Sequence, residues 1–119
     1  MALVPARIDL WTVDLAGPAP SEALLSPAER ARADRFRFAR DRHRYLVAHD
    51  AMRRILGAAL GVAPGALVFD HGPQGKPALA GSPGVHFNLS HSEDLAVLAV
   101  TTRGPIGVDV EAVRPIPEF

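Results

Sequence analysis

The chain has 119 residues, of which 48% are hydrophobic and 22% are charged, and its formal net charge is zero. This length and composition are typical of one folded domain with a small core, and they exclude a disordered chain. The absence of cysteine excludes disulfides, thiolate nucleophiles and cysteine zinc sites. No secretory signal and no apolar run as long as a membrane span is visible, so we expect a cytoplasmic protein without a membrane partner.

Basic side chains are concentrated in one segment, because most of the thirteen lysines and arginines lie between positions 30 and 54. The segment is a local cationic surface, and a solvated, arginine-rich helix face is one interpretation of most of these side chains. A nucleic-acid-binding module is a weak alternative, since the net charge is zero and one tryptophan and one tyrosine offer few stacking platforms. We therefore expect no nucleic-acid partner.

The first half of the chain predicts one strand followed by two helices. Loose alternation around Trp11 favours a strand over about 7–15. Ser26 and Glu29 form a capping-box pattern with Pro27 at the first helical position, so a helix should begin there and run to about residue 38. Apolar residues at three-to-four spacing predict a second helix from 41 to about 60.

The second half predicts short strands separated by clusters of Gly, Pro, Ser and Asp. These strands are expected near residues 66–70, 85–90, 95–102 and 106–111. This order of elements indicates an α+β fold, an antiparallel sheet covered by helices on one face, in a single domain over residues 1–119.

Two carboxylates stand at alternate positions of the last predicted strand. Alternation places Asp109 and Glu111 on one side, about 7 Å apart along the strand, while Val108 and Val110 face the core. Such a pair suits Mg²⁺, which takes one or two protein carboxylates and keeps positions for water and phosphate oxygens, with Mn²⁺ as the alternative. An ordinary solvent-facing strand edge is the competing interpretation of this pattern taken alone.

A second polar group closes the strand predicted near 85–90. Phe87 and Leu89 should face the core, which leaves Asn88 and Ser90 on the polar side and His91 near a turn. Hydroxyl, imidazole and turn amide groups all donate to phosphate oxygens. A hydrolase built on Ser90 and His91 is disfavoured because adjacent strand residues diverge and no G-x-S-x-G elbow occurs. A structural turn histidine is the simpler alternative.

The only lysine of the chain stands in a turn-rich loop, in the order Gly75-Lys76-Pro77. Gly75 permits close backbone approach and Pro77 stiffens the loop, so Lys76 can meet a phosphate as a point charge. The loop lacks the P-loop pattern, and a plain surface hairpin is the alternative.

The order and spacing of these motifs resemble the N-terminal half of Sfp-type 4′-phosphopantetheinyl transferases, from about Trp11 to Phe119. The resemblance rests on S-P-x-E-R at 26–30, the arginine-rich run after it, and then G-K-P, F-N-L-S-H-S and G-V-D-V-E. Such enzymes move the phosphopantetheine arm of coenzyme A onto a serine of an acyl or peptidyl carrier protein, in fatty acid, polyketide or peptide synthesis. The resemblance thus implies coenzyme A as substrate and a carrier protein as partner.

The resemblance also implies roles for individual residues. Asp109 and Glu111 would hold the metal at the coenzyme A pyrophosphate, and His91 would act beside them at the catalytic centre. The residues implied in coenzyme binding are Arg32, Arg44, Gly75, Lys76, Pro77, Asn88, Ser90 and His91. A domain of the same fold that binds coenzyme A or a nucleotide without catalysis is the remaining alternative.

Two features depart from the family pattern. Glu29 stands where some relatives have a basic residue near a phosphate, and its capping role explains it equally well. The family's second half, with its W-x-x-K-E-A-type motif, is expected beyond Phe119, so we expect little transferase activity from this chain alone. In the family the two halves pack together, and we expect either the missing half or a second copy to cover the apolar face left exposed.

Overall fold

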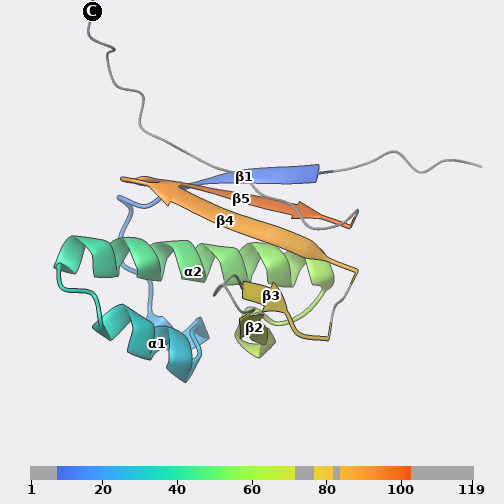
Figure 1. Cartoon of the computed structure of the whole chain (residues 1–119), viewed down its shortest axis with the longest axis horizontal. Coiled ribbons are helices and arrows are strands. Elements are labelled where there is room, and N and C mark those ends of the chain that lie inside the picture. Colours follow the sequence, from blue (N-terminus) through green and yellow to red (C-terminus); the bar gives the residue numbers. More distant parts are fainter. Residues whose placement is uncertain (1–7, 72–76, 82–83, 103–119) are drawn as a thin grey trace, which may run out of the picture.

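The computed structural model of the chain describes residues 8–71, 77–81 and 84–102, and Figure 1 shows a sheet lying above a long helix. The loop at 72–76 and the strand predicted near 106–111 lie outside the described residues. Within the described part, no helix is both long enough and apolar enough to cross a membrane.

Three antiparallel strands form the main sheet. They are β1 (Ile8–Asp14), β4 (His86–Ser92) and β5 (Leu95–Thr101). Strand β5 lies in the middle, in the order β1-β5-β4. Its Leu98 pairs with Trp11 on one side and with Leu89 on the other. Because side chains alternate along a strand, these three residues share one face of the sheet and their chain neighbours share the other.

Two helices lie on one side of this sheet (Figure 1). Helix α1 (Pro27–Asp34) begins with the predicted capping box, since the Ser26 hydroxyl accepts from the Glu29 amide and the Glu29 carboxylate accepts from the Ser26 amide. Helix α2 (Ala39–Leu60) packs directly on the sheet, and α1 packs against α2 on the side away from the sheet. The domain therefore has three layers in the order sheet, α2 and α1.

A short hairpin follows helix α2 and lies on the same side of the sheet as α1 (Figure 1). The 3₁₀ turn η2 (Pro64–Ala66) leads into β2 (Phe69–His71), which pairs antiparallel with β3 (Pro77–Leu79). A second 3₁₀ turn, η1 (Glu22–Leu24), precedes α1.

The main hydrophobic core joins α2, the sheet and the hairpin. Its buried members are Met52 and Leu56 from α2, Leu67 and Leu79 from around the hairpin, and Phe87, Leu98 and Val100 from the sheet. Two smaller clusters extend this core, one around Leu15 and one around Leu25. Apolar burial is the main driving force for folding, and α2 contacts both the sheet and α1, so its packing stabilises all three layers.

The predicted fold class is confirmed, because the chain is α+β with antiparallel sheets and with both helices on one side of the main sheet. Two predicted boundaries were wrong. Helix α1 ends at Asp34 rather than near residue 38, because the chain turns there and Phe36 packs 5.4 Å from the ring of Tyr45. The strand predicted near 66–70 begins only at Phe69, since η2 occupies the residues before it.

Candidate functional site

The residues predicted to bind the coenzyme are spread over several elements. The described ones are Arg32 on α1, Arg44 on α2, Pro77 at the start of β3, and Asn88, Ser90 and His91 on β4. The remaining ones, Gly75, Lys76, Asp109 and Glu111, lie outside the described residues and stay predictions.

Strand β4 presents polar residues on both of its faces. Phe87 and Leu89 face α2 and pack in the main core, so Ser90 faces the opposite side of the sheet. His91 pairs with the buried Ala96 and lies on the helix side, at the exposed end of the strand. Because β4 is the outer strand of the described sheet, a single ligand reaches Ser90 and His91 together only by lying across its outer edge.

Arg44 fastens the turn between β4 and β5 to helix α2. Its Nε donates to Asp94 Oδ1 at 3.0 Å, and its Nη1 lies 4.0 Å from Asp41 Oδ1. A phosphate would have to compete with these two carboxylates for the guanidinium. The contact of Arg44 with the coenzyme stays a prediction, whereas the structure shows that Arg44 holds the end of the hairpin that carries His91.

Arg32 stands at one end of a row of aromatic rings that the sequence did not predict. Its guanidinium carbon lies 5.3 Å from the centre of the Phe36 ring. The Phe36 ring packs against the Tyr45 ring, and Tyr45 stacks on the His49 ring with the ring centres 4.0 Å apart. Burial and the charge of Glu29 raise the pKa of Tyr45 to about 12, so its phenol stays protonated. Among the described residues, no carboxylate forms an ion pair with Arg32.

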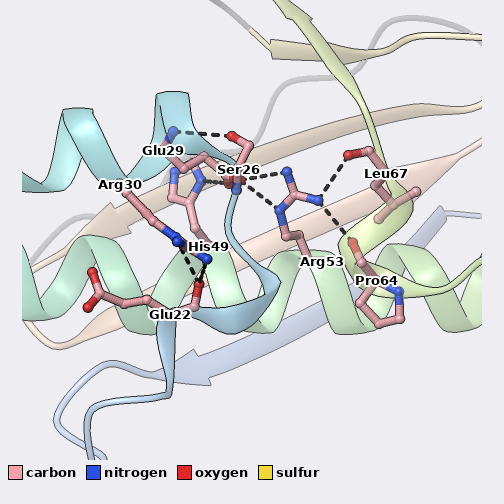
Figure 2. A network of polar contacts seen from close by, with 8 residues as sticks. All are labelled: Glu22, Ser26, Glu29, Arg30, His49, Arg53, Pro64 and Leu67. Atoms are coloured by element: carbon pink, nitrogen blue, oxygen red, sulfur yellow. Dashed lines mark hydrogen bonds and ion pairs between the residues drawn. The ribbon is translucent and has the colours of Figure 1, made fainter.

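Glu29 is the centre of a buried polar network (Figure 2). Besides the Ser26 amide, its carboxylate accepts from His49 Nδ1 at 2.9 Å and from Arg53 Nε at 2.7 Å. Burial opposes ionisation of Glu29, but these hydrogen bonds and the charge of Arg53 outweigh it and lower the pKa from 4.5 to about 2. Glu29 is therefore a structural counter-ion, and its capping role was the only part of this network that the sequence predicted.

Arg53 completes the network from inside the apolar stripe of α2. Its Nη1 donates to the carbonyl oxygens of Pro64 and Leu67, each at 2.9 Å, and its guanidinium carbon lies 5.0 Å from the centre of the Phe69 ring. Sequence reasoning missed this residue because all of these partners are distant along the chain. The one available signal is a charge placed directly after the core residue Met52.

The predicted metal site falls on Asp109 and Glu111, outside the described residues. Within the described ranges, no group of three or more histidine, aspartate or glutamate side chains lies close enough together to hold a metal. As a donor set, two carboxylates at alternate strand positions fit a hard divalent cation such as Mg²⁺.

Comparison with known proteins assigns the class of this domain. Residues 14–103 match the family described as 4′-phosphopantetheinyl transferase, N-terminal. These residues include β4, β5 and both helices, so the match covers the fold and most of the candidate site. The chain therefore belongs to the 4′-phosphopantetheinyl transferase family.

Individual relatives agree with the motif resemblance. The 4′-phosphopantetheinyl transferase HetI of Nostoc sp. (strain PCC 7120) is 40% identical over 97% of this chain and 52% of the relative. Sfp of Bacillus subtilis (strain 168) is 31% identical over 79% of this chain and 42% of the relative. The psf-1 protein of Bacillus pumilus is 39% identical over 74% of this chain and 37% of the relative. The chain thus spans about half the length, or less, of these curated relatives.

Proposed function

We propose that this chain supplies the coenzyme A-binding half of a cytoplasmic 4′-phosphopantetheinyl transferase. The complete enzyme transfers the 4′-phosphopantetheine arm of coenzyme A to a serine of an acyl or peptidyl carrier protein and releases adenosine 3′,5′-bisphosphate. The observation that carries the proposal is the extent of the family match, which includes α1 with Arg32 and the β4–β5 hairpin with Ser90 and His91.

The proposed coenzyme contacts divide into two groups by their chemistry. Cations, a hydroxyl and an imidazole bind phosphate oxygens, and backbone or small polar groups line the nucleotide pocket. The first group is Arg32, Lys76, Ser90 and His91, with Arg44 in competition with its carboxylates; the second is Gly75, Pro77 and Asn88.

Asp109 and Glu111 are proposed to hold Mg²⁺ at the pyrophosphate of the coenzyme. When bound, the ion would neutralise charge on the phosphate oxygens and polarise the phosphorus for attack. Arg32, Lys76 and His91 would orient the same phosphates from the protein side. Because phosphoryl transfer depends mainly on positioning and charge neutralisation, losing one of these contacts should weaken both binding and turnover.

The carrier protein is proposed as the second substrate. The rest of the active site is proposed to come from a further domain of the complete enzyme. The support for this is that the chain covers only 52% of HetI and 42% of Sfp. We expect the chain alone to bind coenzyme A, to show little transferase activity and to associate with itself.

Calorimetric titration of the 119-residue chain with coenzyme A, with and without Mg²⁺, tests this proposal. We expect Mg²⁺-dependent binding that Lys76→Ala and His91→Ala each weaken about tenfold, because each removes a charge-assisted or polar contact to phosphate. Arg54→Ala is the control, since Arg54 is an exposed arginine engaged with Asp50 on its own helix. Absence of binding, or equal binding of an oligonucleotide of random sequence, would contradict the proposal.

A turnover assay separates the enzyme from the non-catalytic alternative. Adding the C-terminal half of a relative to this chain, with coenzyme A, Mg²⁺ and a carrier protein, should restore transfer to the carrier serine. Coenzyme binding without any transfer in the presence of a folded partner half would instead indicate a silent coenzyme-binding domain.

A further inference from the structure

Arg53 is a cation buried in the middle of the domain, with 1% of its surface exposed. Its Nε and Nη2 contact the Glu29 carboxylate, and its Nη1 donates to the carbonyl oxygens of Pro64 and Leu67. Removing an arginine from water is costly, and a well-packed apolar replacement of a buried ion pair is often neutral or stabilising. Stability alone therefore gives no reason for a charged group at this position.

The contacts of Arg53 join separate parts of the fold, as Figure 2 shows for Glu29, Pro64 and Leu67. Glu29 belongs to the first turn of α1, whereas Pro64 and Leu67 lie at the entrance to the β2–β3 hairpin. Among the described residues, no hydrogen bond or ion pair links α1 directly to β2 or β3. Arg53 thus supplies the polar connection between these two elements from its place on α2.

Both elements that Arg53 connects carry proposed coenzyme contacts. Arg32 follows Glu29 by three residues on α1, and Pro77 begins the strand that pairs with β2. The guanidinium is a planar fork with donors in fixed directions, so it sets the orientation of its partners as well as their distance. A lysine ammonium could match the charge of Arg53 but not this geometry.

We propose that Arg53 is a positioning residue for the binding of coenzyme A. Arg53 fixes α1 relative to the β2–β3 hairpin, so that contacts from both elements reach the same ligand. This inference rests on the proposed function. Arg53 itself is 1% exposed, so we expect it to act only through the elements that it holds. Its loss should therefore lower the affinity for coenzyme A even under conditions where the fold is intact.

A double variant, Glu29→Gln with Arg53→Met, tests the role without leaving a lone buried charge. Glutamine keeps an acceptor for the Ser26 amide, and methionine keeps much of the apolar volume of the arginine stem. We expect a lower melting temperature, because the carbonyl oxygens of Pro64 and Leu67 lose their donor, and a coenzyme A affinity lowered about tenfold at a temperature where the variant is still fully folded, as is typical when groups that support a site are lost. Arg53→Lys should also bind more weakly than the wild type, because it lacks the fork.

The matched control is Asp50→Asn with Arg54→Met, which removes the neighbouring ion pair of the same helix and should leave affinity unchanged. Amide hydrogen exchange provides a readout that does not need the coenzyme. In the Glu29→Gln/Arg53→Met variant, the Ala80 amide, which donates to Val68 beside the hairpin, should exchange faster, while the β1–β5 ladder stays protected.

Two results would overturn the inference. One is wild-type affinity in the Glu29→Gln/Arg53→Met variant, and the other is a loss of affinity that appears only at temperatures where the variant has begun to unfold. Failure of the wild-type chain to bind coenzyme A would contradict the proposed function instead, and amide exchange would still decide whether Arg53 couples α1 to the hairpin.

Discussion

The Glu29 carboxylate both caps the start of helix α1 and pairs with a buried arginine in the core of the domain. It accepts a hydrogen bond from the Ser26 amide as part of the capping box, it accepts another from His49, and it is the counter-ion of Arg53. An ionised carboxylate has enough lone pairs for these donors, and a basic residue here would leave Arg53 buried beside a like charge. The acidic residue at this position therefore follows from the presence of Arg53.

The lowered pKa of Glu29 predicts sensitivity to acid. Its pKa falls from 4.5 to about 2 on folding, so the ionised group stabilises the fold above pH 4.5, and this contribution is lost as the pH falls from 4.5 toward 2. The contribution is of the order of 3 kcal/mol. Urea unfolding across this range should show the loss in the wild type and a flatter profile in Glu29→Gln.

The control for this experiment is Asp70→Asn, which changes an exposed carboxylate on β2 and should keep the wild-type profile. If the wild type and Glu29→Gln lost stability in parallel, another group would be responsible for the acid sensitivity.

At the residue scale, local patterns could be predicted and distant contacts could not. The capping box lies within four residues, so its sequence pattern was sufficient. The orientations of Phe87 and Leu89 followed from strand alternation, and the register agrees with them. By contrast, Arg53 contacts partners 11 to 24 residues away, and nothing in the local spacing indicates which carbonyl oxygens a buried arginine will meet.

Among the elements, helix α2 determines how the rest of the chain is arranged, and its end is shaped by two glycines. Gly61 closes the helix in the left-handed conformation, with φ of 69°. The Val62 amide then donates to the Gly57 carbonyl at 2.9 Å, which brings the returning chain onto the last turn. A Cβ atom at Gly57 would lie 2.6 Å from the Val62 carbonyl oxygen and 3.2 Å from Pro64.

Gly57→Ala should therefore destabilise the protein, although alanine is the better helix former by about 1 kcal/mol. The 2.6 Å contact requires the backbone at Val62 to move, and such overpacking typically costs about 1–3 kcal/mol. The midpoint of urea unfolding measures the change. Gly65→Ala should be nearly neutral, since its Cβ would meet only Leu24 at 4.0 Å, and a stabilised Gly57→Ala would show that the chain after α2 shifts easily.

The elements that were predicted well have strong local signals. Strands β1, β4 and β5 are rich in apolar residues between turn signals, helix α2 has apolar residues at three-to-four spacing, and their observed ends lie close to the predicted ones. Strand β3 was not predicted, because Pro77-Ala78-Leu79 has little strand propensity and is extended through its pairing with β2. The end of α1 was misplaced for a similar reason, since the contact of Phe36 with Tyr45 joins two different helices.

For the whole molecule, α2 covers one face of the main sheet, and no described element covers the other face, which has exposed apolar residues on β1 and at the start of β5. Trp11 and Leu98 face α2, so Ile8, Leu10 and Leu95 lie on the opposite face. These three residues are 53%, 62% and 40% exposed, and they are half of the exposed large hydrophobic residues among those described. Exposed apolar residues on one face of a sheet are typical of an interface, and we expect a second copy to cover them in the isolated chain.

Leu10→Asp should therefore reduce self-association, because a dimer would have to bury an unpaired carboxylate on this face. Sedimentation velocity over a range of protein concentrations should show the wild type associating as concentration rises and Leu10→Asp remaining monomeric. Val68→Asp is the matched control, since Val68 is 61% exposed, close to the 62% of Leu10, but lies outside the main sheet. It should associate like the wild type. A wild-type chain that stays monomeric at high concentration would contradict self-association. A Val68→Asp variant that loses association as strongly as Leu10→Asp would show that the contact is not specific to this face of the sheet.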